Sequence, residues 1–408
     1  MRDLWRWALG GAAAAALAIG AGELVAGLFS GPSLVAGIGT VVIDLQPPGA
    51  KDLMVALFGT NDKAALEVAT ALGAIAIGGI LGLLARRDIR LATAGFVAFG
   101  AVGYLAAIKD PSADVIVAIA AVFAAVAAGV LSLPYLLPLR APAAVDAGRR
   151  QLLAVGRQSA FVVGGVLVLG GAGAVVGRFL SSRVPILVGP GVTPRPTTTL
   201  PPAPVGASFD DITGLTPLIV PNDEFYKIDT RLSVPRLSAD GWTVKVKGLV
   251  NQELELTYEQ LAAMPLFEQW VTIACVSNEV GGDLVGNAKW AGVRLMTVLE
   301  QAGLKPDATQ VVGRSFDGFT TGFPTDHLRG AGTNAMIALL MNDEVLPPAH
   351  GFPVRLIVPG LYGYVSATKW LKEIELTTWE GFNAYWVVSS ISFSHFVEDR
   401  ADSDPVPN

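Results

Sequence analysis

The stretch QWVTIACVSNEVGGDLVGNAKWAGVRL, residues 269–295, contains the single cysteine of a 408-residue chain. Cys275 stands at the end of an apolar, strand-like run and is followed by a polar, glycine-rich loop. A side chain at such a junction between strand and loop is expected to face a cleft. A second distinctive stretch, MNDEVLPPAHGFPVRLIVPGLYGYVSATKWLKEIEL, follows at residues 341–376.

The neighbours of Cys275 limit its chemistry. A chain with one cysteine forms no intramolecular disulfide, and soft thiolate sulfur suits redox metals. A structural zinc site needs about four protein ligands, and neither a histidine nor another cysteine lies within ten residues. A catalytic thiol needs a nearby base. His327 and His350 are distant in the sequence and could act as this base only if the fold brings one of them close to Cys275. A buried structural cysteine is the remaining alternative.

Residues 209–408 alternate short strand-like runs with short helical patterns, which predicts an α+β domain with its own core. The strand-like runs are residues 242–249, 267–275 and 353–360. Residues 257–260, TYEQ, predict a capping box that opens one helix, and residues 294–302 predict a second amphipathic helix.

Residues 4–180 are far richer in Ala, Val, Leu, Ile and Gly than the rest of the chain. With 52% hydrophobic and 16% charged residues, the chain is too apolar for a wholly soluble protein. We predict a transmembrane domain over residues 1–183, because a spanning helix needs about 20 mostly apolar residues. Its five expected spans are residues 4–29, 65–85, 91–108, 114–137 and 159–180, and residues 33–45 are interpreted as a re-entrant segment.

The positions of the arginines predict the orientation in the cell membrane. Loops rich in Lys and Arg stay on the cytoplasmic side, so the N-terminus is expected in the cytoplasm and residues after 180 outside it. Residues 148–156, GRRQLLAVG, also resemble a twin-arginine export signal, with ordinary positive-inside charge as the alternative. The arginines concerned are Arg2, Arg6, Arg86, Arg87, Arg90, Arg140, Arg149, Arg150 and Arg157.

Composition also indicates the linker and the partners. Residues 184–208 carry seven prolines, which favours an extended tether between the two halves. The net charge of -6 without a basic stripe argues against nucleic acid, whereas membrane lipid is an expected partner. All three histidines lie in the second half, so the spans offer no paired imidazoles for haem. No haem is therefore expected, and electron transfer needs a separate partner or a quinone.

Residues 275–295 and 341–376 together resemble the signature of the sulfite oxidase family of molybdopterin-dependent oxidoreductases. The resemblance extends over most of residues 218–380, and the segment from HGFPVR to KWL is its most specific part. It implies an α+β sulfite oxidase-like molybdopterin-binding domain, so that with the apolar first half the expected fold is an α-helical transmembrane bundle followed by this domain. It also implies a molybdenum-molybdopterin cofactor whose metal is bound by one cysteine thiolate, which makes Cys275 the metal ligand and the catalytic residue.

The resemblance further implies which residues contact the cofactor. The pterin ends in a phosphate and presents many ring donors and acceptors, and the guanidinium fork of Arg355 suits a phosphate. The implied contacts are Asn222, Tyr226, Lys227, Cys275, Ser315, Asp317, His350, Arg355, Ser366, Ala367, Thr368 and Lys369.

Two departures from the family pattern bear on the substrate. Sulfite-oxidising members have arginines in the loop after the ligand cysteine, where this chain has Glu279 and Val280. Phe319 stands where those members place an active-site tyrosine. An acidic residue near the metal repels an anion. We therefore expect two-electron oxygen-atom transfer on a small molecule (a sulfoxide, an N-oxide or a sulfite-like substrate), with neutral substrates favoured.

Two other functions remain open at this point. The first is a non-enzymatic membrane assembly or binding module with a repurposed molybdopterin fold, because five spans exceed what anchoring requires. Retention of Cys275 together with Arg355 and Lys369 argues against such a decayed site. The second is a transporter, for which only Glu23 and Glu67 are candidate intramembrane charges.

Overall fold

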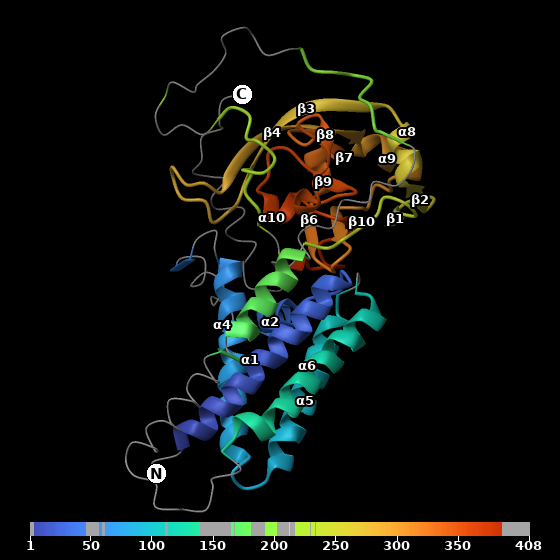
Figure 1. The fold of residues 1–408 in the computed structure, drawn as a ribbon. Coiled ribbons are helices and arrows are strands. Elements are labelled where there is room, and N and C mark those ends of the chain that lie inside the picture. The colour runs from blue at the N-terminus through green and yellow to red at the C-terminus, as the bar shows by residue number, and fades with distance from the viewer. Residues whose placement is uncertain are drawn as a thin grey trace, which may run out of the picture. The chain divides into compact units, whose positions relative to one another are not determined.

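The computed structural model describes residues 4–45, 57–58, 62–110, 113–138, 165–166, 168–180, 192–201, 212, 217–228, 230–232 and 234–385. The chain divides into two compact units (Figure 1). The first is Met1–Pro185 together with Thr230–Ser233, and the second is Ile186–Asp229 together with Val234–Asn408. The first unit is helical, and the second contains two β-sheets.

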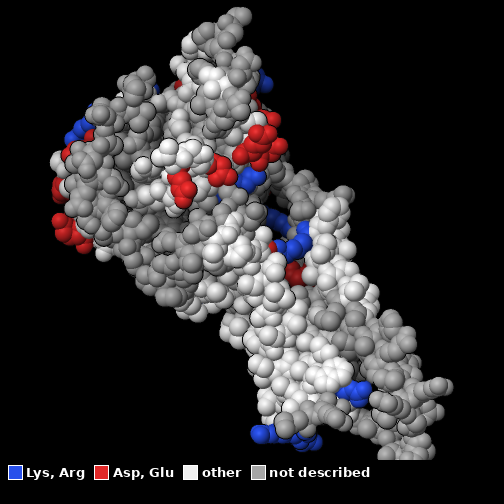
Figure 2. Space-filling view, turned by 90° about the vertical axis from the view of Figure 1, so that its left-hand side faces the viewer, with Lys and Arg blue, Asp and Glu red and all other residues white. Residues whose placement is uncertain are grey.

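The helical unit contains α1 (Leu4–Leu28), α2 (Leu34–Leu45), α4 (Asp62–Leu84), α5 (Ile89–Ala107) and α6 (Val115–Leu136). Among the described residues, four helices are long and apolar enough to cross a membrane: Leu4–Leu28, Lys63–Leu84, Ile89–Ala107 and Val115–Leu136. Figure 2 shows that the described surface of this unit is mostly free of charged side chains over much of its visible length. These four helices agree with the first four predicted spans.

Small residues bring the helices close together. Helix α1 packs against α4 and α6. A Cβ atom added at Gly11 would lie 2.2 Å from the carbonyl oxygen of Gly78 and 2.7 Å from the Cα of Gly82. The backbones of α1 and α4 are therefore in direct contact, as in membrane helix pairs with small residues at the interface.

Charged side chains within the helical unit form ion pairs. The guanidinium of Arg178 donates to the carboxylate of Glu67, on α4. Arg231, from the short segment Thr230–Ser233, donates to Asp110 at the end of α5 and is 8% exposed. A buried charge is costly unless it is paired, so removing either partner of the pair between Arg231 and Asp110 would leave an uncompensated charge.

The described residues include only part of the other segments predicted for the membrane half. The fifth predicted span, residues 159–180, contains a helix over Val168–Leu180, and residues 159–164 and 167 lie outside the described residues. Within residues 33–45, Leu34–Leu45 form the 12-residue helix α2, and the hydroxyl of the preceding Ser33 accepts from the Ala36 amide. The arginine-containing stretch 148–156 lies outside the described residues.

The second unit is built from two five-stranded sheets. In one sheet, β1 and β10 run parallel and the other pairs run antiparallel. In the other sheet the order is β3-β4-β7-β8, and β9 pairs with β7. The strands are β1 (Thr243–Gly248), β2 (Leu254–Thr257), β3 (Leu266–Ala274), β4 (Val285–Arg294), β5 (Gln310–Ser315), β6 (Thr320–Pro324), β7 (Met336–Met341), β8 (Glu344–Val345), β9 (Arg355–Ile357) and β10 (Leu371–Thr377).

Short helices join the strands: α8 (Tyr258–Ala263), α9 (Leu295–Ala302), η2 (Thr325–Arg329), η3 (Pro348–His350) and α10 (Gly363–Ser366). The predicted capping box is confirmed, because the Thr257 hydroxyl accepts from the Gln260 amide and the Gln260 side chain accepts from the Thr257 amide. The predicted strand over residues 353–360 is shorter than expected. Only Arg355–Ile357 pairs as β9, since Pro353 and Pro359 lack the N–H that a ladder needs.

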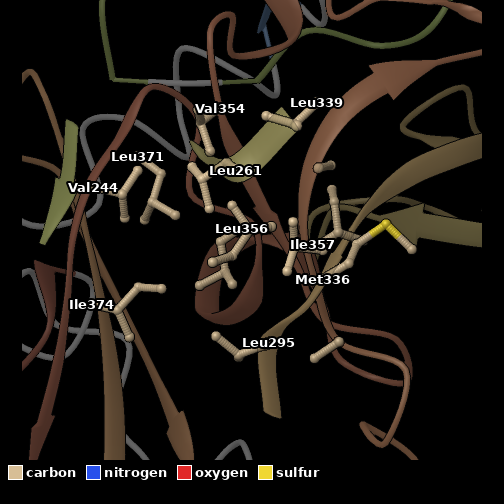
Figure 3. Packing of buried hydrophobic residues seen from close by; sticks show 14 of the residues in the cluster. Val244, Leu261, Leu295, Met336, Leu339, Val354, Leu356, Ile357, Leu371 and Ile374 are labelled. Atoms are coloured by element: carbon tan, nitrogen blue, oxygen red, sulfur yellow. The ribbon is translucent and has the colours of Figure 1, made fainter. Parts of the chain in front are cut away.

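The core of the second unit lies between the two sheets (Figure 3). Val244 and Ile374 from one sheet and Met336 and Leu356 from the other are fully buried in one cluster. The resulting α+β architecture confirms the fold class predicted from the sequence.

Part of the predicted linker follows the edge of β3. The backbone amides of Thr197 and Thr198 donate to the Leu266 carbonyl, and the Glu268 amide donates to the Thr198 carbonyl. Within the described part of the linker, residues 192–201, the threonine run therefore hydrogen-bonds to the second unit. The rest of residues 184–208 lies outside the described residues.

Candidate functional site

Cys275 immediately follows β3 and begins the loop that returns to β4. Its amide donates to the Leu284 carbonyl, and its carbonyl accepts from the Asn278 amide. The Asn278 side chain closes the loop by accepting from the Leu284 amide at 2.8 Å. The thiol residue is half-buried, so it is held in a defined loop without being sealed in the core.

The segment Val220–Tyr226 brings two aromatic rings to this end of the sheet. The Val220 amide donates to the Asn287 carbonyl of β4. Phe225 stacks on Tyr226 with ring centroids 5.3 Å apart, and Gly286 of β4 makes room for it, because a Cβ there would lie 2.6 Å from the Phe225 ring. Phe225 is thus wedged against β4 beside the tyrosine.

Tyr226 connects the thiol to a cationic group. Burial raises the pKa of the Tyr226 phenol, the positive charge of Arg355 opposes the rise, and the charge of Cys275 adds to it. A Cβ added at Gly363 would lie 3.5 Å from the Tyr226 hydroxyl and 3.7 Å from the Ala274 carbonyl. The phenol, the start of α10 and the end of β3 therefore meet beside Cys275.

His350 is buried in this region and is neutral. Burial, the largest cause, and the charges of Arg355 and Lys369 together lower the pKa of the imidazole to about 3, against the hydrogen bond to Asn222. Its Nε2 lies 2.6 Å from the Asn222 carbonyl. A carbonyl only accepts, so Nε2 carries the proton and Nδ1 is an acceptor. Within the described part of the chain, this buried Nδ1 has no hydrogen-bond partner.

Two cationic side chains are buried close to His350. Arg355 donates to the His350 carbonyl at 3.0 Å and lies over the Trp290 ring, 5.1 Å from its centroid. Arg355 is 5% exposed and Lys369 is 6% exposed. Gly351, at φ 113°, fits between their chains, because a Cβ there would lie 2.9 Å from the Lys369 Cα. The local field is therefore strongly positive.

The segment from α10 to Lys369 is tied to its surroundings by buried hydroxyls. The Ser366 hydroxyl donates to the Tyr362 carbonyl at 2.9 Å. The hydroxyls of Thr368 and Thr321, both fully buried, lie 2.7 Å apart. Ala367 ends α10, where its amide donates to the Gly363 carbonyl. These bonds orient the backbone that carries Lys369.

Asn222 and Lys227, two further predicted cofactor contacts, direct their side chains to other parts of the protein. The Asn222 side chain donates to the Met341 carbonyl and to Glu344, so its backbone carbonyl is the group that meets His350. Lys227 donates to the Asp223 carbonyl, although its charge still acts on His350.

Ser315 and Asp317 lie in the turn between β5 and β6. The Ser315 hydroxyl accepts from the Asp317 amide, and the Asp317 carboxylate accepts from the Phe319 amide. The amide of Phe316, between them, donates to the Trp370 carbonyl, which joins this turn to the residue after Lys369. The structure does not show either side chain in contact with Cys275 or His350.

Sequence reasoning missed three residues that shape the site. Trp290 stacks under Arg355, and Phe225 packs edge-on against His350 at 5.5 Å. Gly351 permits the close approach of the two cationic segments. The glycine directly after His350, which ends η3, was a usable signal, whereas the two aromatics have the pattern of ordinary core residues.

This arrangement suits an anionic ligand that also carries hydrogen-bond donors. Arg355 and Lys369 supply positive charge in a buried setting, and Nδ1 of His350 supplies an unused acceptor. No group of three or more His, Cys, Asp or Glu side chains able to hold a metal occurs among the described residues. A metal bound by Cys275 would complete its ligand set from such a ligand.

Comparison with known proteins agrees with this chemistry. The profile of the oxidoreductase molybdopterin binding domain matches residues 231–386. The uncharacterized oxidoreductase YuiH of Bacillus subtilis is 36% identical over 145 residues, which are 36% of this chain and 69% of that protein.

Larger enzymes match over a smaller share of their length. A mitochondrial sulfite oxidase of Drosophila melanogaster is 32% identical, and the match covers 41% of this chain and 32% of the enzyme. An NADH nitrate reductase of Solanum lycopersicum is 30% identical over 41% of this chain and 20% of the enzyme. The chain thus spans less than a third of either. From the match to most of the Bacillus protein and to the domain profile, the chain belongs to the sulfite oxidase-like family of molybdopterin-dependent oxidoreductases.

Proposed function

We propose that this protein is a membrane-anchored molybdenum oxidoreductase that acts on a small, neutral substrate on the extracytoplasmic side. The observation that carries the proposal is the half-buried thiol of Cys275 beside Tyr226, whose ring stacks on Phe225, which in turn packs against His350 next to buried Arg355. When bound, the molybdenum-molybdopterin group supplies two-electron oxygen-atom transfer, X + H2O ⇌ XO + 2 electrons + 2 protons.

The chain's own residues would hold the cofactor by charge and by hydrogen bonds. Arg355 and Lys369 neutralise its phosphate, and the planar guanidinium is already oriented by Trp290 and by the His350 carbonyl. Neutral His350 accepts a hydrogen bond from a ring N–H through Nδ1. The Cys275 thiolate is the protein's ligand to the metal.

The remaining proposed cofactor contacts act mainly through the backbone. The side chains of Ser366 and Thr368 are engaged within the protein, so these residues and Ala367 position the main chain before Lys369. Asn222 holds the tautomer of His350 through its carbonyl. Tyr226, beside Cys275, would contact the bound cofactor, and Lys227, Ser315 and Asp317 complete the predicted set.

The loop after Cys275 favours a neutral substrate such as a sulfoxide or an N-oxide. Glu279 is exposed in this loop and Val280 is fully exposed, so a negative charge and an apolar side chain stand where an anion would approach. Phe319 packs on Tyr385 with ring centroids 5.5 Å apart and adds no hydroxyl. The reaction runs in either direction, depending on the electron partner.

The helical half is proposed to anchor the enzyme with its N-terminus in the cytoplasm. Support comes from four helices of spanning length and apolar composition and from arginines concentrated before the first span, after α4 and within residues 140–157. The lipid bilayer and a separate electron-transfer partner or a quinone are the proposed partners, and the proposed cofactor set contains no haem.

Metal analysis of the purified full-length protein tests the proposal. We expect about one molybdenum per chain, an electron paramagnetic resonance signal from molybdenum during redox titration, and loss of both in Cys275→Ser. Ser277→Ala, an exposed change in the same loop, is the matched control and keeps the metal. Wild-type protein without molybdenum, or Cys275→Ser with full metal content, would sink the proposal.

A further inference from the structure

The tight turn between β7 and β8 consists of Asn342 and Asp343, both at positive φ, 50° and 67°. The hairpin belongs to the same sheet as β4 (Figure 1). Asn and Asp adopt this conformation more readily than other residues with a side chain, so the turn alone explains either of them. The two differ in where their side chains go. Asp343 pairs at the surface with the Lys289 ammonium, whereas Asn342 is half-buried and bonds inward.

The side-chain amide of Asn342 makes three hydrogen bonds. Its Oδ1 accepts from the Lys289 backbone amide at 2.9 Å, and its Nδ2 donates to the Val220 carbonyl at 3.0 Å and to Oδ1 of Asn222 at 2.9 Å. A backbone amide only donates and a backbone carbonyl only accepts, so partners at both ends fix which atom is oxygen and which is nitrogen. Asn342 thus joins β4 to the segment that contains Val220 and Asn222.

Asn222 is held by the same turn through both atoms of its own amide. Its Oδ1 accepts from Asn342, and its Nδ2 donates to the Met341 carbonyl at 3.2 Å and to the Glu344 carboxylate at 3.1 Å. With the side chain fixed in this way, the backbone carbonyl of Asn222 faces Nε2 of His350 at 2.6 Å. The turn between β7 and β8 therefore determines where the hydrogen-bond acceptor of the buried imidazole lies.

We propose that Asn342 is a positioning residue for His350, which keeps the ring proton on Nε2 by holding Asn222 in place. The inference rests on the proposed function for its purpose, because the group that Nδ1 would accept from is a ring N–H of the cofactor. Without the Asn222 carbonyl at this distance, the two neutral tautomers differ less in free energy. A ring with its proton on Nδ1 would present a donor to another donor.

Nitrogen-15 spectra of the histidine rings in the full-length protein, purified in detergent, test the proposal at neutral pH. Asn342→Gly keeps the positive φ and removes the amide. The ratio of the Nε2–H form to the Nδ1–H form of His350 should fall about threefold to tenfold, which corresponds to the net strength of one hydrogen bond. Asp343→Gly places glycine at the next position of the same turn and is the matched control, which should leave the ratio unchanged.

Asn342→Asp provides a second variant of nearly the same shape and keeps the test valid if Asn342→Gly does not fold. A carboxylate oxygen would face the Val220 carbonyl and Oδ1 of Asn222, both of them acceptors, so the ratio should fall at least as far. An unchanged ratio in both Asn342 variants overturns the inference. An equal fall in Asp343→Gly also overturns it, because any loosening of the turn would then have the same effect.

The molybdenum retained after gel filtration by the same preparations separates this inference from the proposed function. A lower ratio together with less retained molybdenum supports both. A lower ratio in variants of a protein that never contains molybdenum supports the role of Asn342 and rejects the proposed function, and bound molybdenum with an unchanged ratio does the reverse. A lower ratio with molybdenum fully retained overturns the purpose given to Nδ1.

Discussion

Replacing His350 with glutamine should change how the stability of the cofactor-free protein depends on pH. The imidazole pKa is lowered to about 3 in the folded chain from its ordinary value of 6.5, chiefly by burial. Between these values the unfolded chain binds more protons, so the wild type loses stability as the pH falls through 6.5 towards 3. Glutamine does not titrate, and its amide N–H can still donate to the Asn222 carbonyl.

The size of the effect follows from the two pKa values. Each unit between them is worth about 1.4 kcal/mol, and because the unfolded imidazole is only partly charged near pH 6.5, lowering the pH from 7 to 5 removes about 2 kcal/mol. The wild type should lose this amount beyond what His350→Gln loses over the same interval. Contributions from the carboxylates are common to both proteins and cancel in the difference.

Urea unfolding followed by tryptophan fluorescence measures the difference, since Trp290 and Trp370 are buried near His350. Nitrogen-15 spectra of the ring give an independent result, because the chain has three histidines and single replacements assign each signal. The neutral form with the proton on Nε2 should persist to pH 5. Equal pH dependence in the two proteins, or a charged His350 ring at pH 5.5, would refute the reasoning.

Three further changes give separate tests. Thr321→Val should lower the free energy of unfolding by about 1–3 kcal/mol, because it leaves the buried Thr368 hydroxyl without its hydrogen-bond partner. Replacing both threonines with valine should recover part of this loss, as measured by denaturant titration. Gly351→Ala should destabilise the domain by about 1–3 kcal/mol, since alanine strains a φ of 113° and crowds a neighbouring Cα, and its denaturation midpoint should fall. Arg355→Lys should reduce molybdenum retained after gel filtration, whereas the exposed Arg329→Lys should not. Equal retention in the last pair would contradict the assigned role.

Local patterns predicted much of the second unit correctly. The capping box at residues 257–260 and the strand before Cys275 each depend on neighbours in the chain, so composition and spacing were sufficient. The position of the thiol directly after the strand followed from the same local reasoning.

Features that depend on distant residues were not predictable in this way. The tautomer of His350 is set by a carbonyl 128 positions away in the chain. Trp290 lies under Arg355 because β4 and β9 both pair with β7. In sequence, a tryptophan in an apolar strand predicts only a core residue. The contacts that join Tyr226 to His350 through Phe225 likewise exist only after separate segments meet.

The pair between Arg231 and Asp110 affects how the protein can be divided. Residues 230–233 belong to the helical unit although they follow the proline-rich segment, so the chain re-enters that unit after leaving it. A fragment that starts at residue 209 keeps the guanidinium and loses the carboxylate that neutralises it. Protein purified whole, in detergent or lipid, therefore keeps a pair that a cut within residues 184–208 would separate.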